Sequence, residues 1–197
     1  MKRWAPVCAA LLLGLYWWMA AAVSREHSTT ADEIFHVTAG YSYWKFNDYR
    51  LQPENGNLPQ RVAALPLLTQ NLQFPRRDQA AWLTADAAEI GHQFFHELGN
   101  DLPRMLAAAR GMIALLGVAC GVLAFAWSRS LFGDGGALVT ATLCAFCPHL
   151  LAHGGFATSD LAATLGFLAV TLAGWRLLHR VTWGRIAATG GAAALLA

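Results

Sequence analysis

The chain has 197 residues, of which 56% are hydrophobic and only 13% are charged. A soluble domain carries about 25% charged residues, so this composition indicates a membrane protein. The net charge of +2, without a basic face or an RNA-binding motif, argues against a nucleic-acid partner. All four cysteines lie in apolar stretches, where we expect small buried side chains and no disulfide framework.

The first apolar run covers residues 5–23 and follows Lys2 and Arg3. Its length is close to that of a full membrane span. A signal peptide is the alternative, because the alanines at 20–22 resemble a cleavage site. Trp17 and Trp18 are typical of anchors at a membrane surface, and the run is longer than a usual signal core, so we predict a retained helix.

Residues 24–104 form a long polar segment that contains several prolines. Thr30 and Glu33 have the spacing of a capping box, which predicts a helix that continues to about Phe46. Apolar residues recur at helical spacing over 58–69, which predicts an amphipathic helix at the membrane surface. Residues 79–98 are also predicted to be helical.

The second half of the chain contains further apolar stretches that predict membrane spans. They cover residues 111–127, 137–151 and 161–178, and a fifth, shorter stretch covers 186–197. The fifth is too short to cross a bilayer, so we expect the sequence to be the truncated N-terminal part of a longer membrane protein, with one membrane domain. Gly117 and Gly121 have the spacing that allows close helix packing in membranes.

The basic residues of the short connecting segments predict the orientation of the spans. These residues are Lys2, Arg3, Arg129, Arg176, Arg180 and Arg185. By the positive-inside rule they face the cytoplasm, whereas long loops are exempt from the rule. The long segment 24–104 and the short segment 152–160 are therefore predicted to share the outer face.

Several ionisable residues are predicted to gather on that outer face. They are Asp32, Glu33, His36, Glu54, Arg110, His149, His153 and Asp160. Ionisable groups at a membrane are costly and often functional. Structural alternatives stay open, since Asp32 and Glu33 also suit the first turn of a helix, Asp160 also suits a cap, and arginine side chains reach lipid headgroups.

Three groups of motifs resemble one family of membrane enzymes. They are Asp32-Glu33-Ile-Phe-His36-Val-Thr-Ala-Gly40-Tyr41 with Asp48 to Glu54 and Ala64 to Leu68; Ala109-Arg110; and Pro148-His149-Leu-Leu-Ala-His153-Gly154 with Thr158-Ser159-Asp160-Leu161. Together they resemble bacterial relatives of the dolichyl-phosphate-mannose–protein mannosyltransferases, which are polyprenyl-phosphate-sugar-dependent glycosyltransferases of the GT-C fold. The family commonly has Pro-Glu-x-Pro-Pro-Leu where this chain has Pro53-Glu54-Asn55-Gly56-Asn57-Leu58.

The resemblance implies an all-α integral membrane protein that forms the N-terminal part of a GT-C-type fold. It implies a place in the bacterial cytoplasmic membrane, with an active site on the periplasmic face. The partners would be a polyprenyl-phosphate sugar donor, an acceptor hydroxyl on a protein, lipid or glycan, and the membrane lipids. Some relatives use the glutamate at the position of Glu54 with a distant histidine to hold a divalent metal, and no other cofactor is expected.

The same resemblance assigns roles to particular residues. Asp32 would be the general base, Glu33 would support it, and Asp160 would line the site from the opposite side. A guanidinium suits the departing lipid phosphate, and Arg110 is preferred over Arg61 for this role. The remaining residues predicted to contact substrate are His36, Tyr41, Glu54 and His153.

Two other classes of function remain as alternatives. The first is a transporter or flippase for a lipid-linked or anionic substrate, but transporters place charged residues near the midplane on broken helices. Here the charges are predicted at the outer ends of the spans, which favours an enzyme. The second alternative is a non-catalytic scaffold whose outer loop binds a partner.

Overall fold

A computed structural model describes residues 4–194, and it assigns helices and no β-strand within that range. The described residues form two compact units. The first, here called the apolar unit, comprises residues 4–20, 114–154 and 160–194. The second, here called the polar unit, comprises residues 21–113 and 155–159.

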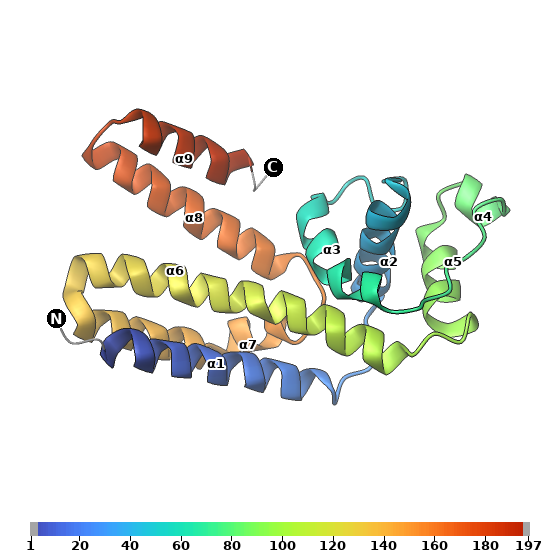
Figure 1. Cartoon of the computed structure of the whole chain (residues 1–197), viewed down its shortest axis with the longest axis horizontal. Coiled ribbons are helices and arrows are strands. Elements are labelled where there is room, and N and C mark those ends of the chain that lie inside the picture. Colours follow the sequence, from blue (N-terminus) through green and yellow to red (C-terminus); the bar gives the residue numbers. More distant parts are fainter. Residues whose placement is uncertain (1–3, 195–197) are drawn as a thin grey trace. The chain divides into compact units, whose positions relative to one another are not determined.

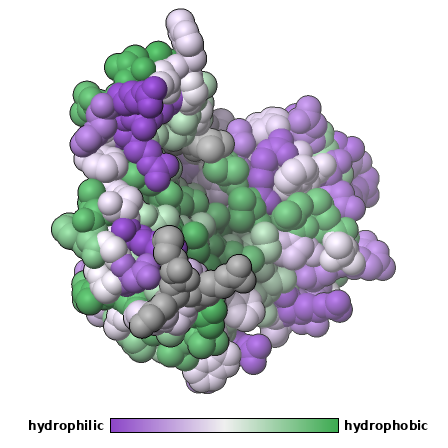
Figure 2. Space-filling model, turned by 60° about the vertical axis from the view of Figure 1, so that its left-hand side comes forward, coloured by the Kyte–Doolittle hydropathy of each residue, from purple (hydrophilic) through white to green (hydrophobic). Residues whose placement is uncertain are grey.

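Three helices are long and apolar enough to cross a membrane: α1 (Trp4–Ser24), α6 (Leu102–Ala145) and α8 (Asp160–His179) (Figure 1). Large hydrophobic side chains on these helices are exposed, including Leu11 at 70%, Leu143 at 68% and Phe167 at 62%. Hydrophobic residues also cover broad areas of the face drawn in Figure 2, and hydrophilic residues gather in separate patches. These features support the predicted class of helical membrane protein.

Helix α6 is broken at Gly133, where φ is 69° and ψ is −166°. A positive φ suits glycine, which has no Cβ to clash, and the chain reverses direction at this point (Figure 1). Ala137 and Ala141, after the break, form a buried cluster with Ala9 of α1 and Phe125 of α6. The arm of α6 before Gly133 includes the span predicted at 111–127.

The span predicted at 137–151 is not one continuous helix in the structure. Helix α6 ends at Ala145, and the short helix α7 (Pro148–Gly154) follows after an interruption at 146–147. Proline lacks an N–H and clashes with the preceding turn, so it is tolerated at the first position of a helix and not in the middle. Pro148 occupies that first position, and it separates the two helices.

Small residues allow close helix packing in the apolar unit. A Cβ at Gly117 of α6 or at Gly154 of α7 would collide with the side chain of Tyr16, and one at Gly121 would collide with Leu13. The Tyr16 hydroxyl donates a hydrogen bond of 2.9 Å to the carbonyl of Leu150. The packing predicted from the spacing of Gly117 and Gly121 is confirmed. Helices α8 and α9 (Trp183–Ala194) pack together as a hairpin (Figure 1).

The polar unit is built around α2 (Ala31–Phe46), which the capping box predicts correctly. Its other elements are α3 (Asn57–Ala64), the 3₁₀ turn η1 (Leu65–Thr69), α4 (Ala80–Leu83), α5 (Ala87–His92) and the π turn η2 (Gln93–Glu97). Helix α2 packs against α3, η1 and α5. The helix predicted at 58–69 is thus divided between α3 and η1, and the one at 79–98 is divided among three short elements.

The core of the polar unit is aromatic and tightly packed. Tyr43, Leu51, Trp82 and Ile90 form a buried cluster, against which Phe46 and Phe74 pack. At another point α2 meets α3 so closely that a Cβ at Gly40 would collide with the backbone carbonyl of Gln60. These contacts hold α2 firmly, and with it the acidic residues of its first turn.

Candidate functional site

Glu33 lies in the first turn of α2 and is completely buried. Its carboxylate accepts a hydrogen bond of 3.0 Å from the backbone N–H of Thr30, and the Thr30 hydroxyl accepts one from the backbone N–H of Glu33. This reciprocal pair is the predicted capping box. One oxygen of the carboxylate therefore has a local structural role at the start of the helix.

The guanidinium of Arg110 forms a buried ion pair with this carboxylate. Its Nε donates to Glu33 Oε1 at 2.6 Å and its Nη2 donates to Glu33 Oε2 at 2.7 Å. The other N–H groups donate to backbone carbonyls, those of Ser24, His27 (3.0 Å) and Ser28 (2.9 Å). A guanidinium has five N–H donors, and all five are used here.

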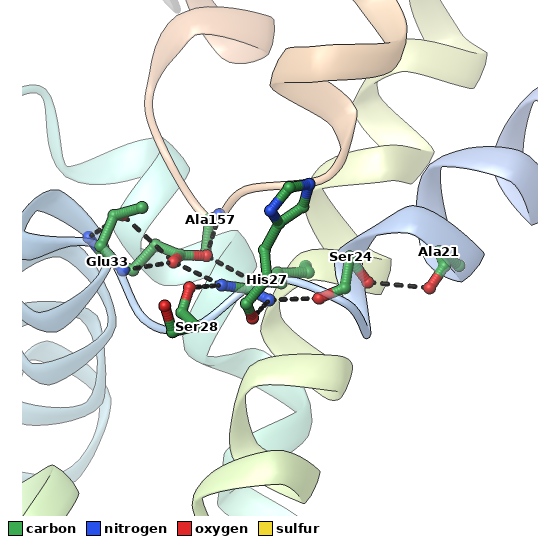
Figure 3. A network of polar contacts seen from close by, with 8 residues as sticks. Ala21, Ser24, His27, Ser28, Glu33 and Ala157 are labelled. Carbon is green, nitrogen blue, oxygen red and sulfur yellow. Dashed lines mark hydrogen bonds and ion pairs between the residues drawn. The ribbon is translucent and has the colours of Figure 1, made fainter.

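The same carboxylate also holds the segment 155–159. The backbone N–H of Ala157 donates to Glu33 Oε1 at 2.9 Å. Next to it, the ring of Phe156 lies 5.4 Å from the Arg110 guanidinium and 5.4 Å from the imidazole of His27. Figure 3 shows that the His27 imidazole points away from the network, which uses only the carbonyl of that residue. Glu33 and Arg110 thus join three segments that are far apart in the sequence.

The electrostatics of Glu33 follow from these contacts. Burial raises the pKa of a carboxyl group, because it disfavours the charged form. The hydrogen bonds from Arg110, Ala157 and Thr30 and the positive charge of Arg110 outweigh burial, and they lower the pKa of Glu33 below its ordinary value of 4.5. Glu33 is therefore ionised at neutral pH, and it is paired with a cation that is only 2% exposed.

Asp32 precedes Glu33 in the sequence but has a different environment. It is exposed in the first turn of α2, and its backbone carbonyl lies 2.9 Å from Nδ1 of His36. His36 itself is buried, with the side-chain amide of Gln52 3.4 Å from the same nitrogen. Of the two adjacent acidic residues, Asp32 is therefore exposed and Glu33 is fully buried.

The contacts of Arg110 do not fit its predicted role as a phosphate ligand. That role needs N–H donors directed at a ligand, whereas those of Arg110 are all directed at protein acceptors. We therefore assign Arg110 a structural role as the partner of Glu33. The sequence does not decide this pairing, because a guanidinium suits a phosphate as well as a carboxylate.

Other predicted residues of the polar unit lie outside this network. Tyr41 is only 3% exposed and packs against Phe74 and Phe94, with ring centroids 5.7 and 5.1 Å away, so it belongs to the aromatic core. Glu54 is exposed in the loop before α3. Burial and the negative charge of Glu54 together raise the pKa of Tyr43 to about 12.

Arg61, the second predicted phosphate ligand, lies on a small aromatic surface. Its guanidinium is 4.7 Å from the ring centre of Trp44 and 5.4 Å from that of Tyr49. It also donates a hydrogen bond to the Tyr49 hydroxyl, and the indole N–H of Trp44 donates to the Arg61 carbonyl at 2.9 Å. These contacts orient the arginine at a surface that is partly open to solvent.

The remaining predicted residues, His153 and Asp160, belong to the apolar unit. Nδ1 of His153 lies 3.2 Å from Oδ2 of Asp160, and their side chains are 46% and 52% exposed. Both residues line a cavity of about 400 Å³, together with His149 and the ring of Phe167. The ionisable residues of the segment 149–160 thus lie around one cavity.

Metal binding at Glu54 receives no support from its surroundings. Among residues 4–194, no three side chains of histidine, cysteine, aspartate or glutamate lie close enough to hold a metal ion together. The described part of the chain therefore does not supply a complete donor set around Glu54.

Comparison with known proteins gives no relative: no protein-family model, curated protein or solved structure is significantly similar to the chain.

Proposed function

We propose that the protein is a membrane glycosyltransferase. It would move a sugar from a polyprenyl-phosphate donor to an acceptor hydroxyl on the non-cytoplasmic side of a bacterial cytoplasmic membrane. Two things support this proposal: the motifs that resemble the mannosyltransferase family, and the arrangement of the acidic pair at the start of α2. The three apolar helices support the membrane setting.

The observation that carries the proposal is the contrast between Asp32 and Glu33. Glu33 is fully buried and receives hydrogen bonds from Arg110, Ala157 and Thr30. Its carboxylate is thus fully engaged, and it fixes the first turn of α2 in place. Asp32, in the same turn, is exposed and so is accessible to a substrate. Such a pair suits catalysis, because one acid positions the backbone while the other meets the reactant.

In the proposed reaction, Asp32 is the general base. Its carboxylate takes the proton of the acceptor hydroxyl while the hydroxyl oxygen attacks the anomeric carbon of the donor sugar. The bond between that carbon and the phosphate oxygen breaks, and the phosphate leaves with the lipid. One displacement of this kind inverts the anomeric centre. General-base catalysis of this type typically contributes about 10²–10⁴-fold to the rate.

Other residues act through position or contact. Glu33 and Arg110 are positioning residues, since they hold the backbone around Asp32 and have no donor or acceptor directed at a reactant. Asp160 lines the site and His153 contacts substrate, as the family resemblance implies. Both side chains are about half exposed at a cavity of the apolar unit, which supports these roles because a ligand can reach them.

The test uses membranes that contain the protein, incubated with a labelled polyprenyl-phosphate sugar. Asp32→Asn is expected to insert normally and to lose transfer by about 10²–10⁴-fold. Asp78→Asn is the matched control, because Asp78 is an exposed acid on a loop of the same unit, and it should keep the wild-type rate. Wild-type transfer by a well-folded Asp32→Asn protein would remove Asp32 from this role. Movement of the intact donor across vesicles without a labelled product would support the transporter instead.

A further inference from the structure

The polar unit contains a cavity of about 440 Å³. Of the predicted site residues, Arg110 alone lines it. It lies between the segment that follows α1 and the beginning of α6. Small-molecule sites in proteins have volumes of about 300–1,000 Å³, so the cavity is large enough for a ligand. Its wall has two chemically distinct parts, which limits what can fill it.

One part of the wall is basic. Arg25, His27 and His96 line the cavity and are exposed. No aspartate or glutamate is among the lining residues. Arg110 also contributes to the wall, but its charge is balanced by Glu33 and its donors are occupied. Apart from this pair, the permanent positive charge among the lining residues is that of Arg25, and His27 and His96 line the same wall. This composition suits an anion with several oxygen acceptors.

The other part of the wall is apolar and belongs mainly to α6. Leu102, Leu106 and Ala107 line the cavity from the first turns of that helix. The same helix continues into a stretch long and apolar enough to cross a membrane, and α1, which is also long enough to cross, ends at Ser24 just before Arg25. The cavity thus lies beside the C-terminal end of α1 and the N-terminal end of α6, two helices of membrane length.

We propose that this cavity binds the anionic phosphate head of a membrane lipid. The phosphate would be held by Arg25, His27 and His96, and the first carbons of the lipid tail would lie along Leu102, Leu106 and Ala107. A free anion would use only the basic part of the wall, whereas a lipid uses both parts. This inference goes beyond the proposed function, because it concerns lipid binding and does not require sugar transfer.

The test measures binding to the purified chain in an uncharged detergent by titration calorimetry. The probe is dioctanoyl phosphatidic acid, and farnesyl phosphate, inorganic phosphate and dioctanoyl phosphatidylcholine are compared with it. Both lipid phosphates are expected to bind saturably, and the tighter one identifies the preferred tail. Arg25→Gln should weaken their binding by about tenfold, since it removes a charge-assisted contact to phosphate. Ala107→Phe should abolish it, because Ala107 is exposed on the wall and a ring there fills the cavity.

Arg104→Gln is the matched control. Arg104 is an exposed arginine of α6 that does not line the cavity, so its replacement should leave the affinity unchanged. An equal loss in Arg104→Gln and Arg25→Gln would show a general attraction to positive charge and overturn the proposal. Equal binding of inorganic phosphate or of phosphatidylcholine would overturn it as well, as would a lack of saturable binding. Asp32→Asn should keep lipid binding, which separates this test from that of sugar transfer.

Discussion

Glycines let helices approach closely in both units, but the two units differ in how their ionisable side chains are placed. In the polar unit, a buried ion pair and its backbone partners hold distant segments together at Glu33 and Arg110. In the apolar unit, Gly117, Gly121 and Gly154 let helices approach until Tyr16 and Leu13 fill the space above them. In the apolar unit, Nδ1 of His153 lies 3.2 Å from Oδ2 of Asp160, but both side chains are about half exposed.

The comparison shows that burial, more than chemical type, separates a structural charge from an accessible one. A charge taken out of water needs a partner for nearly every donor and acceptor, and then it has none left for a ligand. A half-exposed pair keeps its hydration and can exchange a partner for a substrate. Replacing members of each pair, and of the glycine contacts, therefore tests the distinction directly.

Glu33→Gln is expected to have the largest effect on folding. The change leaves the Arg110 guanidinium buried without its counter-charge, which in other proteins costs about 3–5 kcal/mol. Thermal or denaturant unfolding in detergent micelles measures the loss. Glu54→Gln is the control, because Glu54 is an exposed glutamate of the same unit, and it should change stability by less than about 0.5 kcal/mol.

The double variant Glu33→Gln/Arg110→Met sharpens this test. Removing both charges eliminates the uncompensated guanidinium, so the double variant should be more stable than Glu33→Gln alone. Additive losses would mean that the two side chains do not depend on each other, contrary to the network in Figure 3.

The ion pair also predicts how stability depends on pH. Since the pKa of Glu33 is lower in the folded state than its ordinary value of 4.5, the pair contributes fully above that pH. The contribution is lost as the pH falls from about 4.5 through the lower folded value. Wild-type protein should therefore lose stability in this acid range more steeply than Glu33→Gln. Parallel pH profiles for the two proteins would contradict the lowered pKa.

Much of this arrangement could be predicted from the sequence. The capping box at Thr30 and Glu33 located the start of α2, because it depends on residues only three positions apart. The apolar stretches at 5–23, 111–127 and 161–178 located helices of membrane length, whereas the stretch at 137–151 is divided between α6 and α7. The glycine spacing located a helix contact. In each case the information is local, or it repeats with the period of the helix.

What the sequence could not predict depends on distant partners. Ala157, whose backbone N–H donates to Glu33, lies 124 residues away in the sequence. Almost any residue can supply a backbone N–H, so the residue type at 157 gives no indication of this contact. Arg110 was assigned to phosphate because a guanidinium suits either a phosphate or a carboxylate, and only the fold decides between them. Tyr41 was predicted to contact substrate because it lies in the motif that resembles the family, whereas its packing against Phe74 and Phe94 encloses it in the core.

The packing of the apolar unit predicts a smaller effect than loss of the buried pair. Gly117→Ala places a methyl group against the Tyr16 hydroxyl and should cost about 1–3 kcal/mol. Gly14→Ala is the matched control, since a Cβ there meets no atom within 4 Å, and it should stabilise α1 by about 0.5–1 kcal/mol. In a Tyr16→Phe background, Gly117→Ala should cost less. The same unfolding measurement applies, and equal effects at the two glycines would contradict the close approach.

Asp160→Asn is expected to have the smallest effect on folding, although it removes the carboxylate that lies 3.2 Å from His153. Both side chains of that pair are about half exposed, and exposed pairs contribute about 0–1 kcal/mol. The first-turn position of Asp160 in α8 adds a helix-dipole contribution of about 0.3–1 kcal/mol. Unfolding of Asp160→Asn, His153→Gln and the double variant gives the coupling between the two residues. A loss of several kcal/mol, as at Glu33, would mean that His153 and Asp160 are also structural. A small loss, with transfer reduced at subsaturating acceptor, would show that His153 and Asp160 act on the substrate more than on folding.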